Sequence, residues 1–475
     1  MSKITKNTAI YTIGSILPKA AGLILLPLYT KYLSPEQYGV LSSMWVLESI
    51  LMVFFSLSFG SSIFRLYWDY KTEEERKKFL GTMFMSMSGM GLVCAILLFA
   101  FQNFIDGIYS GISFYPYFLY SIITVFISNL FDLPQKVLML KDRALHYVML
   151  SVGFFTINSS LIIYFVIYKE QGAAGYMLST LITTILFLPF YLYITFKNVT
   201  LHFSSADFKS MLFFSLPILP TLLSSWVLDL SDRIFIEKYF SLTEVGIYSL
   251  AYKISGIVLI ISGGFNLAFR PAFFKLSNSE NQVEAQDMIY KFNNAFLLVL
   301  LIFFFLLCFF TKEIILLFFD AAYSTAYLYV PIICFSYFLS VIGGVIARYF
   351  EQSKKMKINM YIYIAGALLN IVFNFILIPH MGAYGAAFST VLSMLFVVSI
   401  SYYYSKKKCY FVKLNINLFL IITASLTTIF LLFDLLLNTT LVTALIVKIV
   451  FIAIVSAILI KKYYGYVITL YKTLK

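Results

Sequence analysis

Eight charged residues lie well inside long apolar segments of this sequence. The cations are Lys19, Arg233, Lys253 and Lys448, and the acids are Glu48, Asp132, Asp229 and Asp232. A charge at the centre of a membrane costs about 3 kcal/mol or more unless it faces water or a partner. Each of these positions therefore indicates either a binding site or a buried ion pair.

Three of the cations, Lys19, Lys253 and Arg233, are candidates for binding an anionic substrate. Ammonium and guanidinium groups replace the hydration that a phosphate loses in an apolar environment with charge-assisted hydrogen bonds. Lys19 stands about eleven residues, or about 16 Å of helix rise, from the end of its segment. The alternatives are snorkelling of Lys19 to an interface, a local ion pair at Arg233, and a structural pairing of Lys253 with Glu48.

The seventh apolar segment combines both signs of charge. Asp229 and Arg233 are four residues apart and so share one helical face, Asp232 is adjacent, and Glu237 follows one turn later. This spacing predicts a helix face that is partly self-neutralised.

Neither metal nor redox chemistry is indicated. The four cysteines (Cys94, Cys308, Cys334 and Cys409) and the three histidines (His146, His202 and His380) are scattered singly along the chain. They form neither a disulfide framework nor a ligand spacing typical of metal sites. We expect no cofactor.

The composition identifies the elements that must position these charges. The chain has 475 residues, of which 61% are hydrophobic and 12% charged, whereas soluble proteins are about a quarter charged. Apolar stretches of about twenty residues recur, which predicts an all-α, polytopic membrane protein with about 14 transmembrane helices. The expected spans are 8–31, 39–64, 79–103, 114–138, 145–168, 172–196, 208–236, 243–269, 288–310, 325–349, 358–379, 383–404, 413–436 and 440–460.

The distribution of cations predicts the orientation. With the N-terminus inside, only Lys31, Lys169, Lys238 and Lys312 of the 35 Lys and Arg residues fall in outer connections, and most of the others lie in inner ones. The positive-inside rule then places both termini in the cytoplasm. The net charge of +13 follows the membrane boundary and does not indicate a nucleic-acid partner.

Two pairs of similar segments, one member of each in either half of the chain, predict an internal repeat. The octet Tyr32–Gly39 resembles Tyr239–Gly246 at an offset of 207 residues, and Gly172–Gly175 resembles Gly382–Gly385 at an offset of 210. The repeat predicts a six-helix lobe at 1–200, a second at 201–410, related by a pseudo-two-fold axis along the membrane normal, and two additional helices with a cytoplasmic tail at 411–475. The alternative is that Gly and Ser merely recur in turns.

Arg65 and Arg270 stand at nearly equivalent repeat positions, at the inner ends of the second and eighth spans. They are candidate cations at the inner mouth of a cavity. Ordinary flanking of membrane spans by cations is the alternative.

The N-terminal segment carries a family resemblance. Asn7-Thr-Ala-Ile-Tyr11, Leu17-Pro18, Leu25–Thr30 and Tyr32–Leu41 resemble the signature of the polysaccharide transporter (Wzx-type flippase) branch of the multidrug, oligosaccharidyl-lipid and polysaccharide (MOP) exporter superfamily. The resemblance implies alternating access between two six-helix lobes around a cationic cavity. It implies a flippase that moves undecaprenyl-pyrophosphate-linked oligosaccharides across a bacterial cytoplasmic membrane for surface polysaccharide biosynthesis.

The resemblance also sets the expected partners. They are the polyprenyl-pyrophosphate-linked oligosaccharide and membrane lipids, with a polysaccharide polymerase and a chain-length regulator as candidate protein partners. Export of an anion can be coupled to H⁺ or Na⁺ by an acid that alternates its charge state, and Glu48, Asp229 and Asp232 are the candidates.

Three other functions stay open on the sequence. A lipid II flippase shares the expected architecture, and a cation-coupled multidrug exporter would more plausibly carry a lone acid in the first span, where this chain has Lys19. A membrane-embedded polysaccharide polymerase or ligase would need catalytic groups assembled at an aqueous face. The short outer connections predicted here favour a transporter over an enzyme.

Overall fold

The computed structural model describes residues 3–103, 105 and 111–410, with isolated positions beyond them at 414, 446, 448–450, 453, 457 and 461. Within that part of the chain, the side chains of residues 3–13, 15, 16, 19, 20, 267 and 268 are not described. The regular structure of the described residues is entirely helical, which confirms the predicted fold class.

Contacts divide the chain into two compact units, Met1–Gly246 and Ile247–Lys475. The first unit contains α1 (Lys3–Tyr32), α2 (Pro35–Ser56), α3 (Phe59–Leu66), η1 (Tyr67–Asp69), α4 (Glu73–Ala100), η2 (Phe114–Phe118), α6 (Leu119–Leu140), α7 (Ala144–Ile162), η3 (Ile163–Tyr168), α8 (Gly172–Asn198), α9 (Ser205–Ser215), α10 (Leu219–Leu230) and α11 (Asp232–Tyr239). Helix α12 (Leu242–Ser255) begins in this unit and continues into the second. The second unit contains α13 (Ile257–Ser277), α14 (Gln282–Phe318), η4 (Ala321–Leu328), α15 (Val330–Gln352) and α16 (Met356–Lys408).

Most of these helices are membrane spans by length and composition. Nine helices of the described residues are long and apolar enough to cross a membrane, and the bent pair α9 and α10 makes a tenth. The predicted spans 413–436 and 440–460 lie outside the described residues except for a few positions. The total of about 14 spans and the lobe boundaries at 200 and 410 therefore stay predictions.

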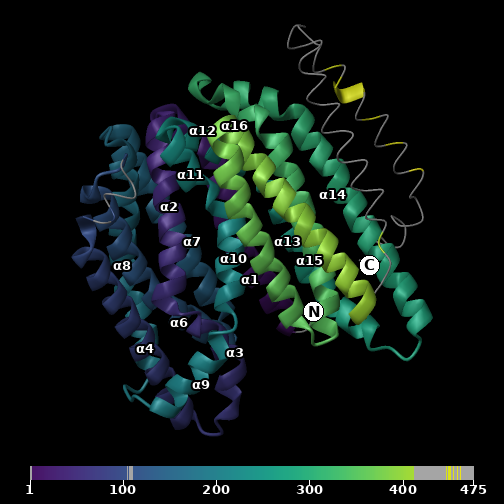
Figure 1. Cartoon of the computed structure of the whole chain (residues 1–475). Coiled ribbons are helices and arrows are strands. Elements are labelled where there is room, and N and C mark those ends of the chain that lie inside the picture. Colours follow the sequence, from purple (N-terminus) through teal and green to yellow (C-terminus); the bar gives the residue numbers. More distant parts are fainter. Residues whose placement is uncertain are drawn as a thin grey trace. The chain divides into compact units, whose positions relative to one another are not determined.

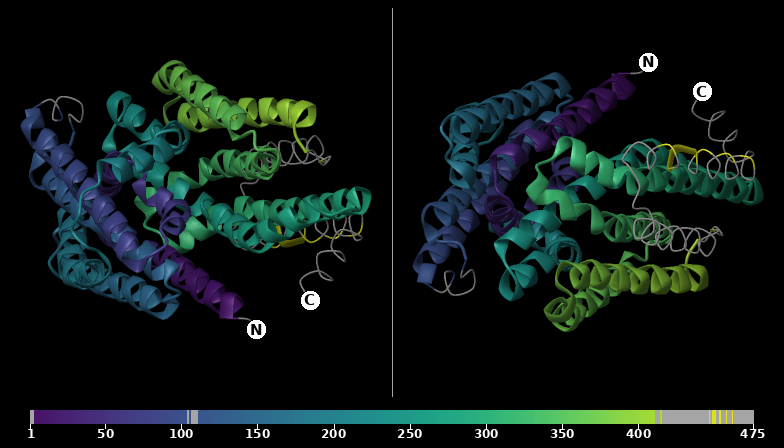
Figure 2. Two further views of the ribbon diagram at one scale, coloured as in Figure 1. Left: turned by 90° about the horizontal axis from the view of Figure 1, so that it is seen from below. Right: turned by 90° about the horizontal axis from the view of Figure 1, so that it is seen from above.

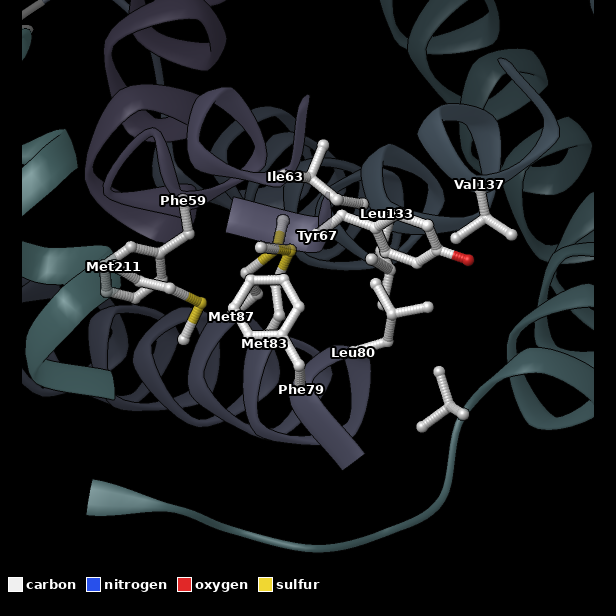
Figure 3. Packing of buried hydrophobic residues seen from close by; sticks show 11 residues of the cluster. Phe59, Ile63, Tyr67, Phe79, Leu80, Met83, Met87, Leu133, Val137 and Met211 are labelled. Carbon is white, nitrogen blue, oxygen red and sulfur yellow. The ribbon is translucent and has the colours of Figure 1, made fainter. Parts of the chain in front are cut away.

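In the first unit, α2, α4, α6 and α8 pack against one another, and α1 packs on α7 (Figure 1). One hydrophobic cluster ties α3, α4, α6 and α9 together through Phe59, Phe79, Met83, Leu133 and Met211 (Figure 3). Because this cluster includes Met211 of α9, the start of the predicted seventh span packs with the earlier helices. In the second unit, α13, α14 and α15 pack together, and α16 lies on α15.

Two predicted spans differ from straight helices, and local residues explain why. The span expected at 208–236 is broken into α9, α10 and α11, with a 45° bend between α9 and α10, because Pro217 and Pro220 lie at that junction and proline interrupts the helical ladder. Helix α16, drawn in light green in Figure 2, contains both spans expected at 358–379 and 383–404. The helical backbone is interrupted between them at Gly382. There the backbone adopts a φ of 57°, a conformation that glycine adopts without steric cost.

The two pairs of similar segments also have similar local structures. Gly172 adopts a φ of 56°, nearly the value at its repeat partner Gly382. In the octets, Ser34 accepts a hydrogen bond from the Gln37 backbone N–H at 3.2 Å, and Ser241 accepts one from the Glu244 N–H at 3.2 Å. Both serines thus start a helix in the same way, which supports the repeat over coincidental turn chemistry.

The octet glycines also contact each other's helices reciprocally. A Cβ atom on Gly39 would lie 1.9 Å from the Leu242 carbonyl oxygen, and one on Gly246 would lie 1.9 Å from the Pro35 carbonyl oxygen. Leu242 and Pro35 are themselves related by the repeat offset. The crossing of α2 and α12 therefore requires a hydrogen atom at both glycine positions.

We expect Gly39→Val to destabilise the protein by about 2 kcal/mol or more, because the added side chain must push two backbones apart. The measurement is thermal unfolding of the purified full chain in detergent. Gly89→Val is the matched control, since a Cβ atom at Gly89 would meet no heavy atom within 4 Å. Equal melting temperatures for the two variants would contradict the close crossing.

Candidate functional site

The most polar part of the first unit is the contact of α2 with α10 and α11. Arg233 and Asp232 at the start of α11 are buried, with 5% and 1% of their surfaces exposed. The Arg233 Nη1 lies 3.0 Å from the Asp232 Oδ1 and donates a hydrogen bond of 2.9 Å to the Asp229 backbone carbonyl. Ser231, between α10 and α11, keeps helical backbone angles, so Asp229 and Arg233 lie about one turn apart. Arg233 is thus locally neutralised by the adjacent Asp232, and Asp229, four residues away, contributes its backbone carbonyl.

Hydroxyl groups hold two carboxylates on α2 and its neighbours. The Ser121 hydroxyl of α6 donates to the Glu48 Oε1 at 2.9 Å, and the Ser43 hydroxyl of α2 donates to the Glu237 Oε2 at 2.8 Å. The other oxygen of Glu237 is buried and has no hydrogen-bond donor among the described residues. This second oxygen of Glu237 can therefore take up a proton without loss of the hydrogen bond from Ser43.

The indole of Trp226 joins α10 to α2 beside these acids. Its Nε1 donates to the Ser49 hydroxyl at 3.0 Å and to the Val46 carbonyl at 3.2 Å. These bonds fix the rotation of α10 relative to α2. Because the backbone stays helical through Ser231, this rotation also sets the direction of Asp232 and Arg233 on α11.

The other predicted cations are distributed between the units. Lys253 is an exposed residue of α12 in the second unit, whereas Glu48 belongs to the first, so their pairing stays a prediction. The side chain of Lys19 lies outside the described residues, although its backbone is part of α1. The structure therefore brings Arg233, Asp229 and Asp232 together, while the proposed roles of Lys19 and Lys253 stay predictions.

Arg65 and Arg270 have similar environments. Arg65 is exposed and pairs with Asp69, and Arg270 is exposed and pairs with Glu351. Exposed ion pairs contribute at most about 1 kcal/mol, so either guanidinium can exchange its partner easily. Weak ion pairs of this kind suit cations at the mouth of a cavity and also suit cations that merely flank membrane spans. The role of Arg65 and Arg270 at an inner cavity mouth therefore stays a prediction.

In the residues that the structure describes, no group of three or more His, Cys, Asp or Glu side chains is arranged to hold a metal ion. The cysteines are free thiols. The polar residues of the α2–α10–α11 contact are carboxylates, hydroxyls and a guanidinium, which can bind ions and phosphate by hydrogen bonds.

Comparison with known families decides the relationship of the chain. The family model described as "Polysaccharide biosynthesis protein" matches residues 4–277, and the MatE model matches residues 217–376. The chain belongs to the polysaccharide biosynthesis protein family. This confirms the resemblance seen in the first two spans.

Curated relatives of this polysaccharide biosynthesis protein are distant in sequence. It is 23% identical to the capsular polysaccharide biosynthesis protein CapF of Staphylococcus aureus, over 86% of this chain and 100% of CapF. It is 21% identical to the Lsg locus putative protein 1 of Haemophilus influenzae, over 60% of this chain and 69% of that protein.

Solved structures show the same fold. The inward closed lipid II flippase MurJ aligns with a TM-score of 0.73 at 19% identity, covering 97% of this chain and 100% of MurJ. An outward-facing multidrug resistance transporter of the MATE family and MOP superfamily aligns with a TM-score of 0.54 at 15% identity, over 85% of this chain and 94% of that one. These likenesses establish a transporter fold for this multi-pass membrane protein.

Several charged partners of this family member were missed by reading the sequence. Asp132 pairs with Lys136 at 2.7 Å, and Lys448 pairs with Glu313 of α14 at 2.7 Å. Both Lys448 and Glu313 have side chains that are 5% exposed. Arg348, expected at the inner end of the span 325–349, is only 5% exposed. The sequence feature that could have indicated these contacts is the position of each charged residue inside or at the edge of an apolar segment.

We expect Asp232→Ala to destabilise the protein by about 3–5 kcal/mol, because it leaves the buried Arg233 charge without its carboxylate. Asp69→Ala removes the partner of exposed Arg65 and should cost less than about 1 kcal/mol. Thermal unfolding in detergent compares the two variants. If the Asp232 and Asp69 variants lose the same stability, the Arg233 pair is not desolvated as described.

Proposed function

We propose that this protein is a flippase that moves undecaprenyl-pyrophosphate-linked oligosaccharide repeat units from the inner to the outer leaflet of a bacterial cytoplasmic membrane. The product would supply the biosynthesis of a surface polysaccharide such as O-antigen, capsule or exopolysaccharide. The observation that carries the proposal is the polysaccharide biosynthesis family match over residues 4–277, in a chain with a transporter fold. The capsular relative CapF, matched along its full length, supports the pathway class.

The chemistry of the substrate fits the intramembrane cations. A pyrophosphate head is anionic and cannot cross an apolar layer without compensating charge, while the polyprenyl tail stays in lipid. In this proposal Lys19 and Lys253 bind the head by charge-assisted hydrogen bonds. Arg233 is held by Asp232, so it contributes to substrate binding only when that partner is exchanged. The two lysines therefore carry most of the proposed binding.

Transport would proceed by alternating access, with the inner-end residues Arg65 and Arg270 meeting the substrate first. Their exposed ion pairs can open at small cost because exposed pairs are weak. The likeness to the lipid II flippase concerns the fold and assigns no substrate. Complementation of cells depleted of their own lipid II flippase tests that alternative directly.

Coupling to H⁺ or Na⁺ is the proposed source of direction. The candidate acids are Glu48, Asp229 and Asp232, and the Glu48 carboxylate already accepts a hydrogen bond from Ser121. A carboxylate with one hydroxyl partner can take up a proton or a cation on its second oxygen. Its change of charge would then favour one access state over the other.

We expect Lys19→Ala to reduce export of surface polysaccharide at least about tenfold, the effect of losing one charge-assisted hydrogen bond of about 1.4 kcal/mol or more. Lys19→Arg should keep most of the activity because it keeps the charge. The measurement is transfer of a lipid-linked oligosaccharide across proteoliposomes, with protein level checked. Lys71→Ala, at an exposed cation in a connection, is the control, and unchanged transfer by Lys19→Ala would remove Lys19 from the proposed site.

We expect Glu48→Gln to abolish the stimulation of transfer by a proton or sodium gradient, while transfer without a gradient changes less than about twofold. Glutamine keeps an oxygen for Ser121 but cannot change its charge. Ser121→Ala removes the hydrogen bond and keeps the acid, so its gradient response should persist. A full gradient response in Glu48→Gln proteoliposomes would exclude Glu48 as the coupling residue.

A further inference from the structure

Arg348 is a buried cation of the second unit that the proposed function does not yet use. It lies on α15, one turn before the helix ends at Gln352, and only 5% of its surface is exposed. A buried charge is costly unless it is paired and hydrogen-bonded. The contacts around its guanidinium therefore decide whether Arg348 has a purely internal partner.

The contacts that Arg348 makes are weak for a buried guanidinium. Its Nη2 lies 3.4 Å from the Oδ1 of Asn293, a fully buried residue of α14. The Asn293 amide is oriented by its own hydrogen bond of 3.2 Å to the Tyr349 hydroxyl. The guanidinium carbon also lies 5.1 Å from the ring centre of Phe269 and 5.7 Å from that of Phe273. These rings attract a cation but accept none of its N–H groups in a conventional hydrogen bond.

Two donor nitrogens of Arg348 have no acceptor. Its Nε and Nη1 are buried and have no hydrogen-bond partner among the residues that the structure describes. By contrast, Arg233, Arg65 and Arg270 each contact a carboxylate. Unpaired buried donors are rare in native proteins and are a common sign of a missing ligand or ion. An anion would satisfy these donors and also match the charge of the guanidinium.

The nearest open surface of α15 is at Gly344, one turn before Arg348. Long side chains in a helix lie over the preceding turn, so Arg348 extends toward Gly344 on the same face of α15. Gly344 is exposed, and a Cβ atom on it would meet no heavy atom within 4 Å. An approaching group can therefore reach this face of α15 without displacing a side chain at Gly344.

The position of the site selects the kind of anion. The same end of the second unit carries Arg270, Lys354, Lys355 and Lys357, and the cation pattern predicts that this end faces the cytoplasm. The phosphates of membrane lipids lie at this depth, and arginine matches phosphate in geometry and charge. The rings of Phe269 and Phe273 lie against the guanidinium group. Its N–H edges are therefore the groups that remain to bind a ligand.

We propose that Arg348, with Asn293, binds the phosphate of a lipid that enters along α15 beside Gly344. The phosphate belongs either to the polyprenyl-pyrophosphate substrate or to an anionic phospholipid, and the two share the same chemistry. The first source rests on the proposed function and would make Arg348 an entry site for the substrate. The second would make it a lipid-binding site independent of that function.

The experiment measures binding of labelled undecaprenyl pyrophosphate and of labelled phosphatidylglycerol to the purified full chain in detergent. We expect Arg348→Gln to weaken binding of at least one of these lipids tenfold or more, and Arg348→Lys to weaken it less. Lys275→Gln is the matched control, because Lys275 is an exposed cation of the same unit to which no substrate contact is assigned. Its affinities should stay within twofold of the wild type.

A second pair of variants tests the site without removing the charge. Gly344→Leu fills the open space beside Arg348 and should weaken binding of the same lipid tenfold or more. Gly263→Leu is its control, because a Cβ atom at Gly263 in the same unit also meets no heavy atom within 4 Å. Melting temperature and gel filtration establish that each variant is folded, and the glycine pair remains decisive if Arg348→Gln is not.

The outcomes separate the inference from the proposed function. Loss of undecaprenyl pyrophosphate binding supports a substrate entry site, and loss of phosphatidylglycerol binding alone supports a phospholipid site. Wild-type affinities for both lipids in Arg348→Gln and Gly344→Leu, or no binding of either lipid by the wild type, overturn the inference. Failure of the wild type to transfer a lipid-linked oligosaccharide in proteoliposomes would instead overturn the proposed function and leave a phospholipid site standing.

Discussion

The need to compensate every charge in an apolar environment governs this protein. Arg233 meets Asp232 within α11, Lys136 meets Asp132 one turn away on α6, and Lys448 meets Glu313 of α14. The Arg233 and Lys448 pairs are buried, and breaking a buried pair is costly, whereas the intact pair is close to neutral. Charges paired in this way are already compensated and attract a ligand weakly. A substrate anion is bound most readily by a cation that keeps unused donors, as Arg348 does among the described residues.

The fold was largely predictable because lipid imposes simple requirements on a sequence. Apolar length predicts each span, and Pro217 with Pro220 marks the bend that the prediction of one straight helix missed. The hydrogen bonds from Ser121 to Glu48 and from Ser43 to Glu237 were not predictable. They depend on the rotation of each helix about its axis, and helices that are apolar nearly all around leave that rotation open. For the same reason, hydropathy does not show that Arg348, near the end of the span 325–349, lies over the ring of Phe269.

The repeat provides information that hydropathy alone lacks. Ser34 and Ser241 begin their helices with the same type of bond, and Gly39 and Gly246 each lie on a carbonyl of the other octet. Such a reciprocal contact is the arrangement expected when two copies of one motif meet across a two-fold axis. Close backbone approach through glycine is a common way for membrane helices to pack, since lipid supplies no hydrophobic force between them. The octets therefore serve helix packing. Their similarity between the two halves of the chain need not reflect substrate binding.

Neutralised and incompletely bonded cations are expected to respond to a ligand in opposite ways. An anion that approaches Arg233 must replace Asp232 and leave a buried carboxylate without its partner, so the exchange is favourable only if the site opens to water. An anion that approaches Arg348 meets two N–H groups that have no acceptor among the described residues, and binding there adds hydrogen bonds without removing any. A transported substrate must also leave, which favours several moderate contacts over one very strong one. A pyrophosphate head shared between Lys19 and Lys253, as in the proposed function, would meet that requirement better than a single deep anion site.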